Sequence, residues 1–212
     1  MDYTLILTIA SIFVPVCATI IATIYTVENR VKAEHKPYLV LDNISNINEI
    51  DKRYYYIVLS GKNNNEKFSI DTPIQDNINV KIRIRNIGYG VATNARFYNL
   101  ETGLKINGLQ EVDSKIDQQL FTTFDLAADS ERSVQATIPT KKKELGYVED
   151  SIDTLCIYQD LNGNIYNFVF SINIKNGGGY SYYAYQPSSH SYKQLMKNYQ
   201  KQTKKIFQDY YK

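Results

Sequence analysis

The hydrophobic positions of this chain follow different patterns in its beginning, middle and end. The first pattern is a continuous apolar stretch, because residues 3–27 include no charged side chain. About 20 apolar residues in a helix are enough to cross the ~30 Å hydrocarbon core of a membrane. We therefore predict a transmembrane anchor over residues 1–28, with a kink at Pro15 that a helix in lipid tolerates.

A secretory signal peptide is the main alternative for this segment. Such a peptide has a basic N-terminal region, a shorter apolar core of roughly 7 to 15 residues and a cleavage site with small residues. The sequence lacks these features, so the anchor is preferred. Within it, Ala18 and Ala22 form a small-xxx-small pair that would let two anchors associate, unless both residues simply face lipid.

The direction of the predicted anchor follows from its flanking charges. Lysine and arginine near a membrane span tend to stay on the cytoplasmic side. No basic residue precedes the span, whereas Arg30, Lys32 and Lys36 lie in the juxtamembrane linker 29–36. We expect a single-pass protein of a bacterial inner or plasma membrane, with its N-terminus outside and everything after residue 28 in the cytoplasm.

The second pattern, over residues 37–176, consists of short runs rich in β-branched and aromatic residues, separated by turn-forming residues. In residues 80–85 aliphatic side chains alternate with cations, as expected of a strand buried on one face. Val80, Ile82 and Ile84 should therefore lie in the core. The predicted strands cover residues 38–41, 54–59, 67–70, 79–85, 92–98, 118–124, 132–138, 152–159 and 165–174.

A hairpin is predicted near the end of this region. Residues 160–164 contain Asn162-Gly163, a dipeptide that accepts the positive φ of a type I′ turn, and strand-like runs flank them. The hairpin should join residues 156–158 to residues 166–168. Because no helical pattern separates the predicted strands, we expect a mainly β fold in which 37–176 form an antiparallel β-sandwich.

A short motif follows the alternating strand. The residues are Asn86-Ile87-Gly88-Tyr89-Gly90-Val91-Ala92-Thr93-Asn94. This motif resembles the N-x-G-x-G-x-A-x-N corner of bacterial immunoglobulin-like β-sandwiches of the CARDB type, where one strand turns into the next. The resemblance implies an Ig-like fold and no activity. Members of that group are mostly exported, whereas this domain is predicted to be cytoplasmic, so an adhesion role is not carried over.

The third pattern is helical and lies at the C-terminus. Apolar residues between Tyr192 and Tyr210 follow i, i+3, i+4, i+7 spacing and gather on one stripe of an amphipathic α-helix predicted over 189–212. Ser189 or Ser191 would cap its start. The stripe either packs on protein, with the lysines in solvent, or the helix lies on an anionic membrane surface. The candidate contact residues on the opposite side are Lys193, Lys197, Lys201, Lys204 and Lys205.

A Gly/Tyr-rich linker is predicted over residues 177–188. It begins with glycines, which favour a flexible connection, and continues with tyrosines whose rings would lie on the sandwich. Tyrosine also supplies a large contact area at a small entropy cost. Tyr180, Tyr182 and Tyr183 are therefore alternative candidates for a partner surface.

Composition and charge narrow the functional classes. The net charge of +2 gives no field that would favour nucleic acid as a partner. The basic residues are concentrated after Ser189, and the abundance of Asn, Ile and Lys is typical of bacteria with AT-rich genomes or of their phages. Cys17 and Cys156 lie in the anchor and in a predicted strand, so they cannot pair, which favours a reducing compartment.

No catalytic residue, metal site or cofactor site is predicted. Gly88-Tyr89-Gly90 lacks the third glycine and the helix of a phosphate loop, and residues 160–164 lack the glycine and glutamate positions of an EF-hand. His35 and His190 have no nucleophile or metal-spaced partner nearby in the sequence. The acids that could converge in space without a diagnostic spacing are Asp125, Asp129, Glu131 and Asp153.

Two functional hypotheses follow from these features. The first is a non-enzymatic, single-pass membrane-anchored binding or scaffolding protein that presents a β-sandwich to an unknown protein partner at the cytoplasmic face. The second is a ligand-gated membrane effector, for example a nucleotide-sensing bacterial defence protein. An enclosed pocket lined by Tyr and Arg would favour the second hypothesis, and a solid core would favour the first. A hydrolase with a hidden acidic pair is a remote third.

Overall fold

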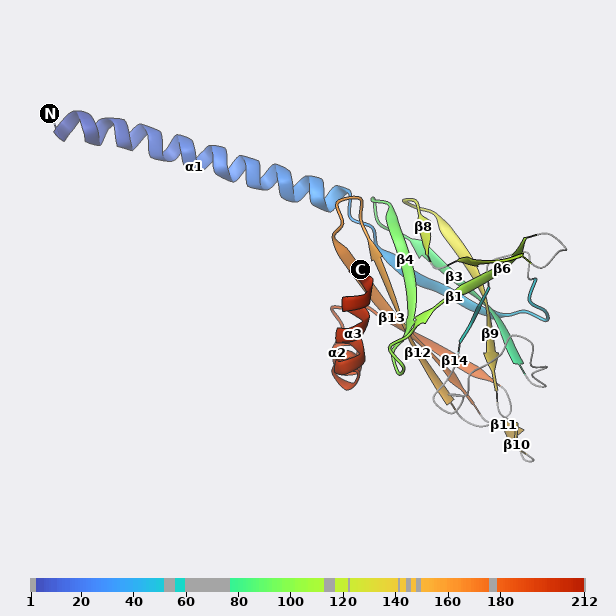
Figure 1. The fold of residues 1–212 in the computed structure, drawn as a ribbon. Helices are drawn as coiled ribbons and strands as arrows, with labels where there is room; N and C mark the ends of the chain where they lie inside the picture. Colours follow the sequence, from blue (N-terminus) through green and yellow to red (C-terminus); the bar gives the residue numbers. More distant parts are fainter. Residues whose placement is uncertain are drawn as a thin grey trace. The chain divides into compact units, whose positions relative to one another are not determined.

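The computed structural model describes residues 3–51, 56–59, 77–112, 117–121, 123–140, 142–143, 146–147, 150–175 and 179–211. The chain divides into two compact units, Met1–Lys36 (unit 1) and Pro37–Lys212 (unit 2). Unit 1 contains one helix, and unit 2 contains the strands and the C-terminal helices (Figure 1).

Helix α1, Tyr3–Glu34, makes up most of unit 1 and passes through Pro15 without a break. The hydroxyl groups of Thr19, Thr23 and Thr26 donate hydrogen bonds of 2.7–2.8 Å to the carbonyl oxygens four residues earlier. Across the residues that the structure describes, no helix combines the length and the apolarity that crossing a membrane requires. The transmembrane anchor predicted over 1–28 is therefore not supported by the structure.

One layer of unit 2 is a six-stranded sheet with the order β1-β3-β9-β2-β6-β7. Neighbouring strands are antiparallel except β2 and β9, which are parallel. The strand predicted over 67–70 lies outside the described residues. The strands of this sheet are β1 (Leu39–Asn46), β2 (Tyr56–Val58), β3 (Asn77–Asn86), β6 (Gly108–Val112), β7 (Asp117–Phe121) and β9 (Glu131–Pro139).

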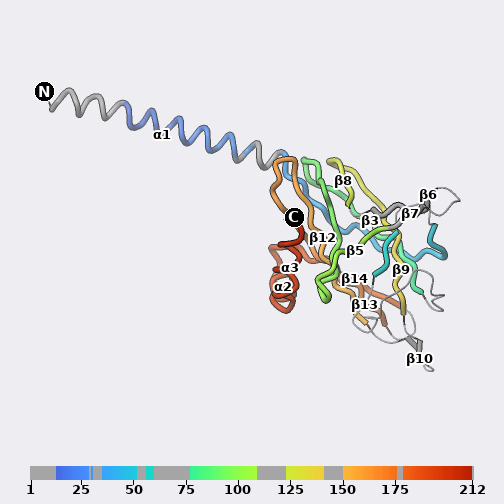
Figure 2. The backbone as a smooth tube through the Cα atoms, in the orientation of Figure 1, coloured from blue at the N-terminus to red at the C-terminus, as the bar shows by residue number. Residues whose placement is uncertain are grey.

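The other layer has the order β14-β13-β12-β4-β5, with β8 paired to β4, and its pairings are antiparallel. The tube in Figure 2 shows the chain passing from β12 through β13 and β14 to the C-terminal helices. A small separate ribbon is formed by β10 (Lys142–Lys143) and β11 (Gly146–Tyr147). The strands of the layer are β4 (Ala92–Asn99), β5 (Lys105–Ile106), β8 (Phe124–Leu126), β12 (Asp150–Gln159), β13 (Ile165–Ile174) and β14 (Tyr180–Tyr185).

The main core lies between these two layers. Val80, Ile82 and Ile84 of β3 are fully buried, as their alternation with cations predicts. From the other layer, Phe97 packs its ring 5.5 Å from that of Phe124, and Phe170 belongs to the same cluster. The fold is therefore mainly β and built from largely antiparallel sheets, as expected from the sequence.

The predicted hairpin is present, but its turn differs from the prediction. β12 pairs with β13 so that Cys156 lies opposite Phe168. Gly163 has a φ of +80°, whereas Asn162 does not adopt a positive φ, and a type I′ turn needs a positive φ at both central residues. Instead, the N–H group of Gly163 donates to the carbonyl oxygen of Asp160 at 3.1 Å within a longer loop.

The C-terminal region differs from the prediction in two respects. The single helix expected over 189–212 is two helices, α2 (His190–Asn198) and α3 (Gln200–Tyr210), because Tyr199 leaves the helical conformation with φ −107° and ψ 29°. The linker predicted over 177–188 contains strand β14, which pairs with β13. Ser189 caps α2 as predicted, since its hydroxyl oxygen accepts a hydrogen bond from the N–H group of Tyr192.

Candidate functional site

Helices α2 and α3 cover the outer face of the layer that contains β12 and β13 (Figure 1). A second apolar cluster lies at this contact, where Leu155, Ile157 and Val169 of the strands and Ile206 of α3 are fully buried. The apolar stripe predicted for the tail therefore packs on the sandwich. The helix residues in the cluster are Tyr192, Leu195, Met196, Tyr199, Ile206, Phe207 and Tyr210.

Hydrogen bonds from tyrosine hydroxyl groups connect these helices to the sheet. Burial raises the pKa of Tyr192 to about 12, and burial together with the charge of Asp153 raises the pKa of Tyr199. Both hydroxyl groups therefore stay protonated at neutral pH and remain donors. The donor and acceptor pairs are Tyr192 with Asn167 Oδ1, Tyr199 with Asp153 Oδ2 at 2.9 Å, and Tyr210 with the carbonyl oxygen of Asn94 at 3.0 Å.

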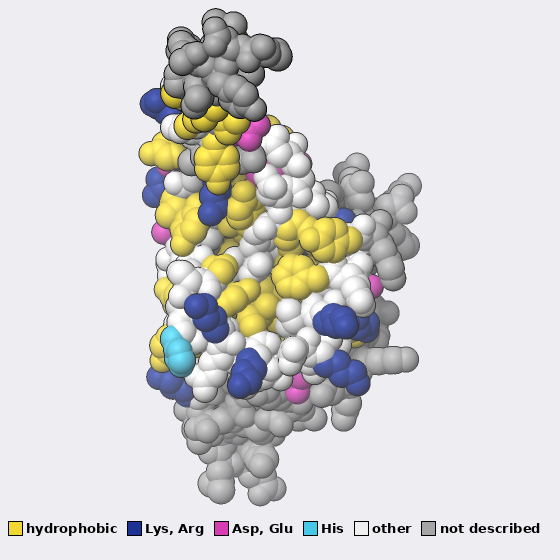
Figure 3. Space-filling view, turned by 90° about the vertical axis from the view of Figure 1, so that its left-hand side faces the viewer, with side chains coloured by type: hydrophobic (Ala, Val, Ile, Leu, Met, Phe, Trp, Pro, Cys, Tyr) yellow, Lys and Arg dark blue, Asp and Glu magenta, His cyan; other side chains and the backbone are white. Residues whose placement is uncertain are grey.

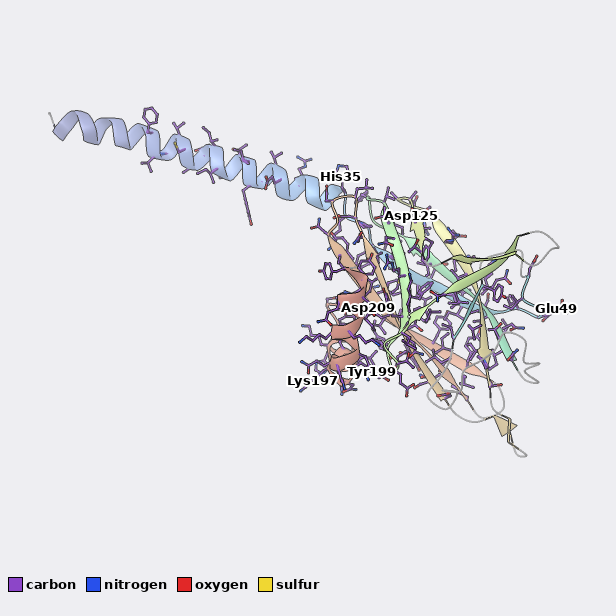
Figure 4. The ribbon with its side chains drawn as sticks, in the orientation of Figure 1. His35, Glu49, Asp125, Lys197, Tyr199 and Asp209 are labelled. Carbon is purple, nitrogen blue, oxygen red and sulfur yellow. The ribbon has the colours of Figure 1, made fainter. Side chains whose placement is uncertain are left out.

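The lysines predicted opposite the stripe form an exposed surface, which we call the basic face. Figure 4 shows Lys197 pointing away from the sheet on which the ring of Tyr199 packs. In Figure 3, Lys and Arg side chains surround hydrophobic side chains on this side of the molecule. The basic face consists of Lys193, Lys197, Lys201, Lys204 and Lys205, all of them exposed.

The three candidate tyrosines of β14 have different environments. The hydroxyl group of Tyr180 donates to the carbonyl oxygen of Ile44 at 3.3 Å, and that of Tyr182 donates to Asn43 Oδ1 at 2.9 Å. Both rings pack against the main core, so they help to close the sandwich. Tyr183 is exposed, and it alone of the three offers its ring to a partner.

Helix α1 has a face of small side chains. Ala18 and Ala22, the pair singled out in the sequence, lie on this face in a shallow open hollow. The large apolar side chains described in the helix after residue 12, such as Ile20, Ile21 and Ile24, are exposed. The residues that line the hollow are Ala18, Thr19, Ala22, Thr23, Thr26 and Val27.

The acids considered for catalysis each have a different partner. Their partners are the N–H group of Asn94 for Asp125 (2.7 Å), Arg85 for Asp129 (2.8 Å), Arg83 for Glu131 (3.9 Å), and the hydroxyl group of Ser171 for Asp153 (2.5 Å). Among the described residues, no three His, Cys, Asp or Glu side chains are grouped as a metal site requires. His35 and His190 are exposed, and Figure 4 labels His35 and Asp125 in separate units.

One end of unit 2 brings together loops that sequence reasoning did not single out as a site. The register places Leu39 opposite Asn86. It also places Thr93 opposite Gln159 at the end of β12, and Ala92 opposite Leu126, the last residue before the loop 127–130. The chain enters unit 2 at this same end. We call it the loop end, and it comprises Tyr38 and the loops 87–91, 127–130 and 160–164.

Asn86 connects the segments of the loop end. Its side chain is fully buried. The carbonyl oxygen Oδ1 accepts hydrogen bonds from the N–H groups of Tyr38 and Gly88, at 3.0 and 3.1 Å. The amide nitrogen Nδ2 donates to the carbonyl oxygens of Gly90, Leu126 and Ala127, at 2.7, 3.1 and 3.1 Å. One amide thus satisfies backbone groups from three parts of the chain.

Asp160 organises the hairpin loop at the same end. Its carboxylate accepts hydrogen bonds from the N–H groups of Asn162 (2.8 Å) and Asn164 (2.9 Å), from the Asn164 side chain (2.7 Å) and from the Tyr166 hydroxyl group (3.1 Å). Burial raises the pKa of Asp160, but these hydrogen bonds lower it by more, so the pKa lies below its ordinary value of 3.8. Burial, together with the hydrogen bond to Asp160, raises the pKa of Tyr166 to about 12.

An Asp160→Asn variant is expected to be less stable than the wild type at pH 7 by about 1–2 kcal/mol, because the neutral amide accepts these hydrogen bonds less well. A carboxyl group whose folded pKa is depressed stabilises the fold above its unfolded pKa, and this contribution is lost as the pH falls through the folded pKa. Urea unfolding should therefore show a difference between the two proteins that shrinks below about pH 4. A difference independent of pH would contradict this role.

Comparison of the chain with protein-family models, curated proteins and solved structures finds no match.

Proposed function

We propose that this chain is a non-enzymatic, single-pass membrane-anchored binding or scaffolding protein, which presents an Ig-like β-sandwich to a protein partner at the cytoplasmic face of a bacterial membrane. The observation that carries the proposal is the uncharged run of residues 3–27, which coincides with the continuous helix α1. A run of this length exceeds the roughly 20 residues that a membrane-spanning helix needs.

The side chains of α1 support a lipid environment. Large apolar side chains such as Phe13, Ile21 and Ile24 are exposed in unit 1, at a cost of about 25 cal/mol for each Å² of apolar surface in water. Lipid would remove that cost. The hydroxyl groups of Thr19, Thr23 and Thr26 are satisfied by carbonyl oxygens of the same helix, so these three bring no unpaired donor into hydrocarbon.

The orientation of the proposed anchor follows from its flanking charges. Arg30, Lys32 and Lys36 follow the uncharged run, which favours a cytoplasmic unit 2.

The small face around Ala18 and Ala22 is where a second anchor would pack. The basic face is held rigidly on the sheet and is complementary to an acidic partner surface. The aromatic packing in the described core supports a binding module over a small-molecule receptor.

The proposed anchor predicts that the full-length chain, expressed in a bacterium, sediments with membranes, resists a carbonate wash and dissolves only in detergent. An Ile20→Lys/Ile21→Lys double variant should move to the soluble fraction, because each charge near the middle of a span costs about 3 kcal/mol. Tyr183→Lys, which adds a charge on the exposed surface of unit 2, is the matched control and should stay with the membrane. A wild-type chain that is soluble without detergent would overturn the proposal.

The proposed orientation predicts that a reporter fused after Lys212 is active only if it functions in the cytosol. Reporters that require export should be inactive in the same position, because unit 2 follows the basic juxtamembrane segment. The ratio of the two reporter activities is the measurement. Activity of the export-dependent reporter would place unit 2 on the opposite side.

A further inference from the structure

Among the described residues of unit 2, the exposed large apolar side chains are concentrated at the loop end. Tyr89 and Leu161, at the tips of two loops, are 81% and 75% exposed. Ile87 next to the first tip is 52% exposed, and Tyr38, whose carbonyl oxygen accepts from the N–H group of Ile87, is 37% exposed. Clustered exposed apolar residues mark an interaction surface, whereas single scattered ones do not.

The C-terminus adds to this cluster. Gln202, near the start of α3, lies against Gly103 in the turn at the opposite end of β4, whereas the hydroxyl group of Tyr210 reaches Asn94 near the start of β4. Helix α3 therefore runs toward the loop end, and the next residue, Tyr211, is 74% exposed. The other exposed large apolar side chains described in unit 2 are Leu104, in the turn at the opposite end, and Tyr183 on β14.

Two of the three loops at this end carry no exposed charge, whereas the third carries the exposed but ion-paired carboxylate of Asp129. Residues 87–91 and 161–164 contain no charged side chain. In the third loop, Asp129 forms an ion pair of 2.8 Å with Arg85, and the carboxylate of Asp160 is buried and hydrogen-bonded under its own loop. The tips can therefore leave water without stranding an unpaired charge, which would cost several kcal/mol.

Only a short stretch of chain joins residue 28, where the predicted anchor ends, to the loop end, because residues 29–34 extend α1 by only about 9 Å. Helix α1 ends at Glu34, and β1 begins at Leu39, opposite Asn86. Five steps between successive Cα atoms cover less than about 20 Å even when the chain is fully extended. Asn86 and Asp160 hold the two tips in defined positions, so little entropy is lost when the tips are immobilised at a surface.

We propose that the loop end is a second membrane contact, in which Ile87, Tyr89 and Leu161 enter the interfacial region of the leaflet from which α1 emerges. The inference rests on the proposed anchoring by α1. Tyrosine is enriched at this level of a bilayer, and apolar side chains are buried about 5–10 Å into the boundary between headgroups and acyl chains. Because the tips are uncharged, neutral phosphocholine lipid is a sufficient partner.

This contact determines how the basic face is presented. With the loop end on the bilayer, strands β4 and β12 extend away from the membrane, and α3 lies along the side of the sandwich. The lysines then point sideways into the cytoplasm and remain available to a protein. The loop end thus orients the binding surface, while α1 holds the molecule at the membrane.

The experiment uses the full chain in phosphocholine nanodiscs, with an environment-sensitive fluorophore on one cysteine and nitroxide-labelled lipids as quenchers. Cys17 is exposed and labels the anchor directly, whereas Cys156 is buried and has a raised pKa, so it stays inert. In a Cys17→Ser background, Tyr89→Cys and Leu161→Cys place the label at the loop tips. Leu104→Cys, at an exposed turn position of the opposite end, is the matched control.

We expect headgroup-level nitroxides to quench the label in the Tyr89→Cys and Leu161→Cys variants, with a clear loss of fluorescence relative to Leu104→Cys. Acyl-chain nitroxides should quench the label on Cys17. Quenching on Cys17 with none at either loop tip would overturn this inference and leave the proposed anchor standing; a protein partner would then be the occupant of the tips. Absence of quenching on Cys17 would overturn the anchor and the inference together.

Discussion

An Asn86→Ala variant is expected to lose at least about 3 kcal/mol of the free energy of unfolding, the largest effect of any single substitution considered for unit 2. The asparagine side chain is fully buried and pairs with two N–H groups and three carbonyl oxygens. Truncation would remove the acceptor of the Tyr38 and Gly88 N–H groups and the donor to the Gly90 carbonyl oxygen in a site closed to water, at about 1–3 kcal/mol for each group that stays unpaired. The carbonyl oxygen of Ala127 would keep its hydrogen bond from the Ser130 hydroxyl group. Urea titration followed by circular dichroism measures the loss in the full chain in detergent.

Two further variants distinguish this role from a general sensitivity of the loop end. Asn162→Ala changes an exposed asparagine in the neighbouring loop and should alter stability by no more than about 0.5 kcal/mol. Asn86→Asp keeps the acceptor oxygens but loses the donor for Gly90, Leu126 and Ala127, and it buries a charge, so it should not rescue the fold. Equal, small losses for Asn86→Ala and Asn162→Ala would refute the assignment.

The strands were predictable because burial on one face leaves a period of two in the sequence. Val80, Ile82 and Ile84 alternate with cations and are buried, as this pattern requires. In β12, by contrast, Leu155, Cys156 and Ile157 are consecutive and all buried. A strand with two covered faces reads as a continuous apolar run. That run is the signal that a further layer, here α2 and α3, packs on the outside of the sheet.

The elements that differ from the sequence-based prediction do so because of contacts between residues far apart in the chain. Periodicity over 189–212 predicts one helix, but the break at Tyr199 coincides with the hydrogen bond from its hydroxyl group to Asp153, 46 residues away. The glycines after residue 176 predict a linker, but tyrosine-rich β14 completes the sheet beside β13. At the hairpin, the buried carboxylate of Asp160 determines the turn in place of the Asn162-Gly163 dipeptide.

The candidate functional surfaces were likewise predictable only where their residues are close together in the sequence. The basic face was visible in the sequence because its lysines lie on one side of a helical repeat. The loop end was not, because Ile87, Tyr89 and Leu161 come from loops separated by about seventy residues, and only the strand register places those loops together. Apolar residues at predicted turn tips are the one local signal that could have indicated this surface.

An Ile206→Ala variant is expected to lose about 3 kcal/mol of the free energy of unfolding, because its truncation leaves a cavity between α3 and the sheet. Ile206 is fully buried against a cluster that includes Leu155 and Val169. Urea titration in detergent, as for Asn86→Ala, measures the loss. The neighbouring Lys205→Ala, on the exposed side of the same helix, is the matched control and should change stability by no more than about 0.5 kcal/mol.

This pair of variants also decides between the two environments considered for the apolar stripe. If the stripe packs on the sandwich, Ile206→Ala lowers stability, and the binding of the protein to anionic vesicles is unchanged. If the stripe instead faced a membrane, Ile206→Ala would leave the unfolding curve unchanged and weaken vesicle binding, since each buried methylene group contributes about 0.8 kcal/mol to transfer into lipid. The hydrogen bonds of Tyr199 to Asp153 and of Tyr210 to Asn94 bind α3 to the sheet, so we expect the first result.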